Sequence, residues 1–225
     1  MKKQEFANPI TEGIIWKQLL LFFFPILLGT FFQQLYNTAD AMVVGQYVGK
    51  QALSAVGGTT GTLINLLVGF FVGLSSGATV IISQFYGARH LDRLSTAVHT
   101  AVAFSVAGGA ALMIVGILLA PWALAAMDTP ADVMDYAITY IRVYFVGMIP
   151  NLLYNMGAGI LRAIGDSRRP LYYLIISCMT NIVLDFVFVL GFNLGVLGVG
   201  LGTVISQLIS AVLVMNRLLR TDDAY

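Results

Sequence analysis

Carboxylate, amide and hydroxyl side chains occur inside segments of the sequence that are otherwise apolar. Asp40 follows the run LLLFFFPILLGTFF without a turn signal between them. Asn181 and Asp185 lie one helical turn apart in TNIVLDFVFV, and Thr203 lies in GVLGVGLGTVISQ. An ionised aspartate that faces lipid costs several kcal/mol, so such residues normally face a bundle interior or a water-filled cavity. These four side chains are therefore candidates for a buried polar site.

The chemistry that these residue types favour is reversible cation binding. A buried carboxylate with hydrogen-bond donors nearby can take up a proton from one side of a membrane and release it on the other. The same oxygens are hard ligands and could hold sodium at Asp40, Asn181, Asp185 and Thr203 instead. The residue types do not separate the two ions. An alternative is that Asp40 and Asp185 only cap or bridge helices.

The depth of these residues supports a shared site. At a helical rise of about 1.5 Å per residue, Asp40, Asp185 and Thr203 each lie about four to seven residues, or roughly 6 to 10 Å, below the outer end of their segments. Three helices thus offer oxygen atoms at a similar level in the outer half of the membrane. A polar cavity at that level would bring them together.

A second group of side chains is predicted to line a substrate cavity. Some of them follow the i, i+3, i+4, i+7 spacing that places residues on one face of a helix with Asp40. The tyrosines could offer aromatic faces to an organic cation, although helix packing is the commoner role of such rings. The candidates are Gln33, Tyr36, Asn37, Tyr140, Tyr144, Asn151 and Asn155.

Transmembrane helices are the elements that must position these residues. Of the 225 residues, 58% are hydrophobic and only 10% are charged, whereas soluble domains carry about 25% charged residues. A spanning helix needs about 20 apolar residues. Pro25 is expected to bend the first such run and Pro150 the fourth, because proline lacks a backbone donor. We predict an all-α integral membrane protein with a single six-helix bundle, its spans at about 14–44, 53–85, 97–120, 138–161, 171–190 and 196–218.

The basic residues predict the orientation of the bundle. Connections on one side of the membrane hold ten of the twelve lysines and arginines, and Lys50 and Arg142 fall on the other side. Because cytoplasmic loops carry an excess of Lys and Arg, both termini are predicted to be cytoplasmic. The ten residues are Lys2, Lys3, Lys17, Arg89, Arg93, Arg162, Arg168, Arg169, Arg217 and Arg220.

Several other classes of protein are disfavoured. The net charge is +1 without a long basic run, which argues against a nucleic-acid partner. One cysteine, Cys178, cannot form an intramolecular disulfide, and two histidines with one cysteine make no metal site. GLSSG at 73–77 fits the G-x-S-x-G pattern of hydrolases, but it lies in a long apolar helix instead of a strand-turn-helix. We do not expect an enzyme.

The motifs of the chain resemble those of a known family. They are LFFFPILLGTFFQQLYNTADAMVVGQYVGKQALSAVG, QFYGAR, ILRAIGDSRRP and NIVLDFVFVLGFNLGVLGVGLGTVISQ, and together they extend over nearly the whole chain. With them the chain resembles the multidrug and toxic compound extrusion (MATE) transporters, especially the DinF-like branch. The resemblance implies an inner-membrane antiporter without a cofactor. Such a protein expels amphipathic, often cationic compounds in exchange for protons or sodium by alternating access.

The same resemblance implies roles for single residues. In the family, an aspartate of the first helix, an asparagine and an aspartate of the fifth and a threonine of the sixth form a cation-coupling site. A proline bend in the first helix is linked to the coupling state, and Pro25 occupies that place. The coupling roles fall on Asp40, Asn181, Asp185 and Thr203.

The chain departs from the family in length. Members have twelve helices in two lobes, and this chain resembles the amino-terminal lobe only. Either a second lobe is missing, or a parallel homodimer imitates the pair. Two alternatives remain: a flippase of the same wider superfamily that moves a lipid-linked headgroup, and a lobe that binds a cation without transport or acts as an assembly partner. A flippase would need cationic residues in its cavity, for which Arg142 is the candidate.

Overall fold

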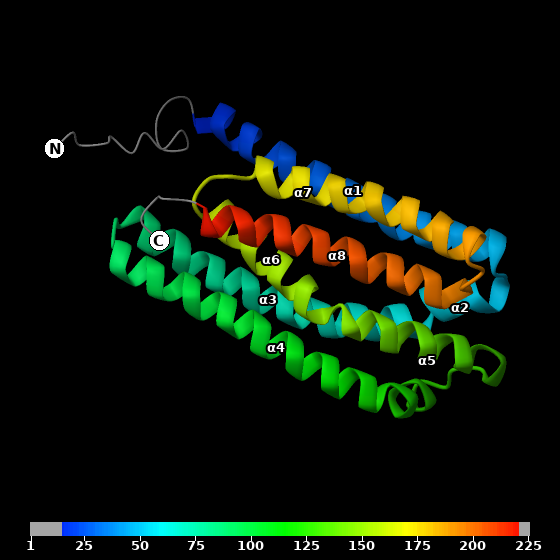
Figure 1. Ribbon diagram of the computed structural model, residues 1–225. Helices are drawn as coiled ribbons and strands as arrows, with labels where there is room; N and C mark the ends of the chain where they lie inside the picture. Colours follow the sequence, from blue (N-terminus) through cyan, green and yellow to red (C-terminus); the bar gives the residue numbers. More distant parts are fainter. Residues whose placement is uncertain (1–14, 221–225) are drawn as a thin grey trace.

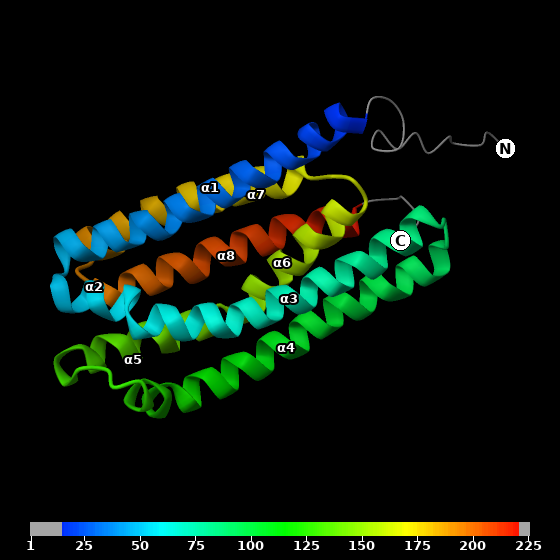
Figure 2. The same ribbon diagram turned by 180° about the vertical axis from the view of Figure 1, so that it is seen from behind.

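The computed structural model describes residues 15–220, and the regular structure in this range is helical (Figure 1). Most of the helices run side by side along one direction, so the bundle is elongated (Figures 1 and 2). The elements are α1 (Ile15–Tyr47), α2 (Lys50–Gly57), α3 (Thr59–Gly87), α4 (Leu91–Ala126), α5 (Ala131–Val146), α6 (Met148–Ala163), α7 (Arg168–Phe186), the π-helix η1 (Val187–Gly191) and α8 (Gly195–Leu219).

Five segments of the described chain are long and apolar enough to cross a membrane, which makes this a multi-pass membrane protein. They are Trp16–Tyr47, Lys50–Gly87, Leu91–Ala126, Arg168–Gly191 and Gly195–Leu219. Each contains the core of one predicted span, although the predicted start of the first span, at Ile14, lies outside the described residues. The predicted fourth span, 138–161, instead falls on α5 and α6, which have 16 residues each. The count of six spans therefore stays a prediction.

The break between α5 and α6 has a local cause. Pro150 lies in the first turn of α6 and has no N–H to donate to the carbonyl of Val146, four residues earlier. Gly147 marks the break, where its N–H bonds to the carbonyl of Tyr144 at 3.0 Å. Its backbone also lies against α8, where an added Cβ would come within 2.8 Å of Gln207 Oε1. Pro150, which was expected to bend this segment, thus lies where the segment divides into two helices. Pro25, in contrast, lies inside α1, and the helix continues through it.

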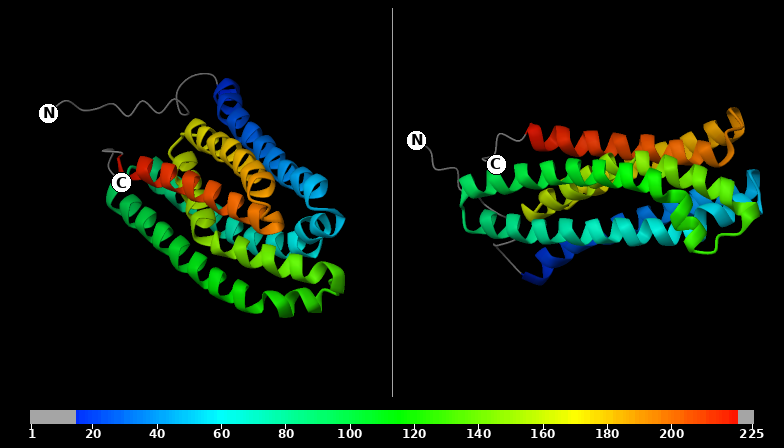
Figure 3. Two further views of the ribbon diagram at one scale, coloured as in Figure 1. Left: turned by 45° about the vertical axis from the view of Figure 1, so that its right-hand side comes forward. Right: turned by 90° about the horizontal axis from the view of Figure 1, so that it is seen from below.

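The helices pack around α8 and α6. Helix α1 packs mainly against α7, which packs against α8, while α6 contacts α3, α4 and α8. In the left view of Figure 3, α1 and α7 form one flank, α3 and α4 form the other, and α6 and α8 lie between them. Two apolar clusters fill the interior: one near the end that holds α2 and α5, around Ile141 and Phe145, and one near the opposite end, around Leu94 and Ile160. This arrangement leaves α1 attached to the bundle along one side only.

The two ends of the bundle differ in charge. The α3–α4 turn, the α6–α7 loop and the end of α8 lie together at one end (Figure 1). Arg89 and Arg220 lie beside the helix ends here, and Arg93, Arg168 and Arg169 lie in the first turns of α4 and α7. The opposite end holds the α4–α5 connection with Asp128 and the start of α5 with Asp132 and Asp135. This segregation agrees with the predicted orientation, which stays a prediction. Lys2 and Lys3, which were counted for it, lie outside the described residues.

Candidate cation-binding site

The four predicted cation-coupling residues meet where α1, α7 and α8 converge. Asp40 comes from the last third of α1, Asn181 and Asp185 from α7, and Thr203 from α8. All four are buried, with exposed fractions of 4%, 0%, 0% and 1% in that order. The spacing that the sequence suggested therefore places these side chains in one buried cluster. Their coupling role stays a prediction.

Few hydrogen bonds link the members of this cluster. Thr203 Oγ1 lies 3.3 Å from Asp40 Oδ2 and 3.0 Å from the carbonyl oxygen of Val199, so one hydroxyl proton serves two acceptors. Asn181 Nδ2 donates to Asp185 Oδ1 over 3.5 Å. The carboxyl groups of Asp40 and Asp185 lie close enough to interact directly. The cluster is therefore richer in acceptors than in donors.

Three buried oxygens of the cluster lack a hydrogen-bond partner in the described chain: Asp40 Oδ1, Asn181 Oδ1 and Asp185 Oδ2. A buried polar group without a partner is costly, and two neighbouring buried anions are more so. No basic side chain compensates them, since the one ion pair seen within residues 15–220 joins Arg169 to Asp166. Carboxylate, amide and hydroxyl oxygens in this arrangement are able to hold a small cation: a proton shared by the carboxyl groups, or sodium.

Small residues and backbone features of α7 and α8 allow this arrangement. Gly202 lies against the Asp185 carboxyl group, and a Cβ at that position would overlap Asp185 Oδ1. Nearby, Ser177 Oγ donates to the carbonyl oxygen of Ser206 at 2.8 Å, which ties α7 to α8. The π-helix η1 begins at Val187, two residues after Asp185. Such widened turns are rare and recur at functional sites.

Two of the predicted cavity tyrosines border the cation cluster. Tyr36 has a buried hydroxyl without a hydrogen-bond partner in the described chain, and it lies near Asp40 and Thr203. Tyr140 is 5% exposed and also lies near Asp40. Its ring is 6.1 Å from that of Tyr144. These rings form an aromatic wall beside the carboxyl groups.

The other predicted cavity residues are not brought to this cluster. Asn37 is exposed, and Gln33 lines a separate pocket. Asn155 Nδ2 bonds to the backbone and side-chain oxygens of Asn151 at 2.9 and 3.0 Å, and Asn155 also reaches that pocket. The residues that were predicted to line one cavity therefore occupy at least two different places. Arg142, the candidate cation for a flippase cavity, is exposed on α5.

Gln207 was not among the predicted cavity residues. Its buried Oε1 lacks a hydrogen-bond partner in the described chain, and its side chain lies near Tyr144. The sequence did carry a signal for it. Gln207 follows Thr203 by four residues, which places both on one face of α8.

Comparisons with known proteins identify the family of the chain. The family model described as MatE matches residues 25–187, more than half of the chain. The chain belongs to the MATE family. This is a family of transporters, and its members include multidrug resistance proteins.

Three similar proteins illustrate the relationship. The chain is 34% identical over 205 residues to the probable multidrug resistance protein YoeA of Bacillus subtilis, covering 89% of the chain and 44% of YoeA. It is 25% identical to the multidrug export protein MepA of Staphylococcus aureus, covering 98% of the chain and 49% of MepA. An outward-facing structure of a multidrug resistance MATE transporter superposes with a TM-score of 0.89 at 25% identity, covering 100% of the chain and 49% of that protein.

The chain spans about half the length of the curated relatives it matches. This agrees with the expectation of a single lobe. Assignment to the DinF-like branch stays a prediction.

Proposed function

We propose that this chain is the cation-coupled lobe of a multidrug efflux antiporter in the cell's inner membrane, exchanging an amphipathic, often cationic compound for protons or sodium. The observation that carries the proposal is the set of three buried oxygens without partners, two of them on neighbouring carboxyl groups. A positive charge bound between two neighbouring buried carboxyl groups would stabilise them. Family membership supplies the context, because related proteins are named for multidrug resistance and export.

The cation would act by changing how α1 is held. Asp40 is the contribution of α1, whereas Asn181, Asp185 and Thr203 belong to α7 and α8. With a proton or sodium ion bound, the carboxyl groups attract a common charge and hold α1 against the bundle. Without it, their repulsion favours separation. Because α1 is attached along one side and carries Pro25, it is the helix best suited to move during alternating access.

Substrate would compete with the coupling cation. The aromatic wall of Tyr36 and Tyr140 lies beside Asp40, so an organic cation that reached these rings would meet the same carboxyl group that binds the proton or sodium. Binding of one cation then lowers the affinity for the other, which is the linkage that exchange requires. The proposed mechanism uses no cofactor. The remaining half of the pathway would come from a second lobe or from a parallel homodimer.

The test is transport by the purified 225-residue chain in liposomes, combined with its mass in detergent. Export of a lipophilic cationic dye would be followed under an imposed proton gradient and, separately, under a sodium gradient. We expect Asp40→Asn and Asp185→Asn to abolish exchange. Asp135→Asn, the same change at an exposed position, should keep it. The gradient that drives export identifies the coupling ion.

A direct binding measurement completes the test if the wild-type chain carries no dye. Isotopic sodium binding and proton release on addition of sodium would be measured in detergent on the same three variants. Loss of cation binding in Asp40→Asn and Asp185→Asn without wild-type transport would identify a lobe that needs its other half. Undiminished cation binding in both variants would contradict the proposed site.

A further inference from the structure

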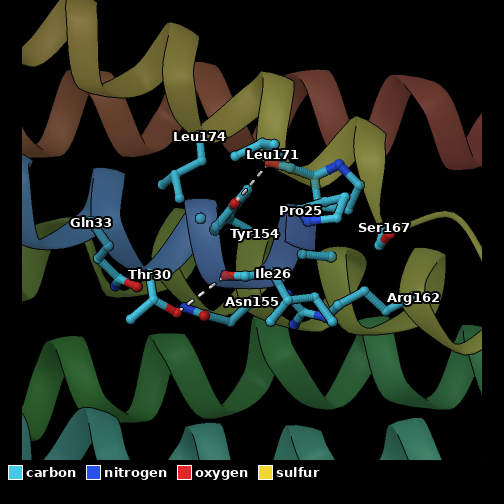
Figure 4. A pocket seen from close by; sticks show the side chains of 13 residues that line it. Pro25, Ile26, Thr30, Gln33, Tyr154, Asn155, Arg162, Ser167, Leu171 and Leu174 are labelled. Atoms are coloured by element: carbon cyan, nitrogen blue, oxygen red, sulfur yellow. Dashed lines mark hydrogen bonds between the residues drawn. The ribbon is translucent and has the colours of Figure 1, made fainter. Parts of the chain in front are cut away.

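A second polar pocket lies apart from the cation cluster, between α1, α6 and α7. It has a volume of about 90 Å³ and extends from Gln33 and Thr30 on α1 to Arg162 at the end of α6. Tyr154, Asn155 and Ser167 contribute further polar groups, as Figure 4 shows. Nothing in the proposed exchange mechanism uses these residues as a group.

Arg162 gives this pocket its charge. The side chain is partly buried, lies in the last turn of α6 and points along the pocket towards Ile26 and Asn155 (Figure 4). Asp166, the acidic residue nearest in sequence, is paired with Arg169, whose Nη1 lies 2.8 Å from Asp166 Oδ2. Within residues 15–220, Arg162 therefore has no acidic partner. A partly buried guanidinium in this state is a binding site for an anion with two or more oxygens, because its planar fork matches phosphate and carboxylate geometry.

The walls of the pocket are compatible with an anionic headgroup. Tyr154 donates its hydroxyl proton to the carbonyl oxygen of Pro170 at 3.1 Å, which fixes the ring as one wall. Gln33 and Ser167 supply an amide and a hydroxyl that are able to donate hydrogen bonds. Pro25 and Leu174 make the rest of the wall apolar. None of the described residues that line the pocket carries a carboxylate.

The surroundings favour a membrane lipid over a free anion. Along the same stretch, α1 exposes the apolar side chains of Leu19 and Phe23, which share a helix face with the pocket residues Ile26 and Thr30. The pocket also lies towards the basic end of the bundle, which the positive-inside rule assigns to the cytoplasmic leaflet. Basic pockets between membrane helices on that side are known to bind lipid headgroups. A headgroup at Arg162 would leave its acyl chains along the apolar surface of α1.

We propose that the pocket between α1, α6 and α7 binds the phosphate group of an anionic phospholipid of the cytoplasmic leaflet, with Arg162 as the main contact. The inference does not depend on the coupling site. A chain that failed to exchange cations would still bind the lipid.

Native mass spectrometry of the purified chain tests the proposal. The detergent-solubilised chain would be titrated with phosphatidylglycerol and, for comparison, with zwitterionic phosphatidylcholine. We expect preferential binding of phosphatidylglycerol. In Arg162→Gln this affinity should fall by about tenfold or more, the usual effect of losing a charged hydrogen bond. Arg168→Gln removes the same charge from an exposed neighbour at the same end and should change it less than about twofold.

Two further measurements decide between explanations. Arg162→Lys keeps the charge but not the bidentate geometry; it should bind the lipid several-fold more weakly than wild type, and it covers the case in which Arg162→Gln does not fold. Inorganic phosphate at millimolar concentration should not displace the lipid. Displacement would identify a free anion as the ligand and overturn the lipid assignment. Equal losses in Arg162→Gln and Arg168→Gln, or equal binding of both lipids, would overturn the pocket itself.

Discussion

The cation cluster has few donors, the Thr203 hydroxyl and the Asn181 amide, and several acceptors. Within residues 15–220, Thr203 supplies the hydroxyl that bonds to Asp40, and it divides its proton between Asp40 and the carbonyl of Val199. The contribution of Thr203 to cation binding therefore depends on its hydroxyl oxygen. This oxygen is able to bind a cation while the hydroxyl proton points to the carbonyl of Val199. The methyl group of the side chain makes no such contribution.

Substitution of Thr203 isolates this oxygen. Thr203→Val has nearly the same shape without the hydroxyl, and we expect sodium or proton affinity to fall about tenfold or more, in line with about 1.5–3 kcal/mol for a hydrogen bond to a charged group. Thr203→Ser keeps the oxygen and should retain most of the affinity. The measurement is isotopic sodium binding or proton counting in detergent. Equal affinities in wild type and Thr203→Val would show that the hydroxyl is not a ligand.

For single side chains, the sequence predicted the members of the buried cation cluster better than the members of the substrate cavity. Asp40, Asn181, Asp185 and Thr203 could be predicted because charged or hydrogen-bonding groups inside apolar segments must face one another. The i, i+3, i+4, i+7 pattern of α1 was less informative. Because α1 contacts the bundle along one side, the pattern leaves Asn37 exposed and Gln33 in another pocket. Which part of a polar face is covered depends on the neighbouring helices.

At the level of the helices, the space around each glycine distinguishes a packed helix face from an open one. An added Cβ at Gly109 of α4 would come within 2.8 Å of the Cα of Ile149 on α6, a backbone atom that cannot move independently. At Gly73 of α3, a Cβ would meet nothing within 4 Å. Gly69, Gly73 and Gly77 recur at a four-residue spacing, which is typical of a seam for close helix approach. A Cβ added at any of these three glycines would meet no atom of the described chain within 4 Å.

Alanine substitutions at these two positions should therefore differ. Gly109→Ala is expected to lower the free energy of unfolding by about 1–3 kcal/mol, since it forces α4 and α6 apart. Gly73→Ala makes the same change on an open face and should leave stability unchanged or slightly raised, because alanine is the better helix former. Unfolding titrations in mixed micelles would measure both. A destabilised Gly73→Ala variant would indicate that α3 packs on another copy of the chain.

The long helices were predictable from apolar length alone. In the fourth segment, Pro150 predicted a bend but not that one helix ends at Val146 and the next begins at Met148, where the backbone of Gly147 lies against Gln207 of α8. Contacts between distant segments of this kind have no signal in the local sequence.

For the whole molecule, the orientation in the membrane is the next quantity to measure. Cysteines introduced as Asp135→Cys and Arg168→Cys lie at exposed positions of opposite ends. In intact cells, a membrane-impermeant maleimide should label the first, and it should label the second only after permeabilisation. The native Cys178 is fully buried and should react little, so it gives a low background. Labelling of both variants in intact cells would contradict a single orientation.

The sequence also predicted the family and the single lobe, because several motifs extend over nearly the whole chain. It could not predict what completes the transporter. Exposed apolar side chains on α1 and α3, such as Phe24 and Phe70, suit lipid and protein neighbours equally. For this reason, the mass of the chain in detergent is the measurement that separates a homodimer from a lobe with another partner.

The division at Gly147 has a consequence for biogenesis. Helices α5 and α6 have 16 residues each, or about 24 Å at 1.5 Å per residue, which is less than the hydrocarbon core of about 30 Å. The pair also carries Asp132, Asp135, Arg142 and Arg162. Neither helix alone is long enough to cross the bilayer. Because both helices pack against α4 and α8, we expect this segment to insert stably only together with these two neighbours.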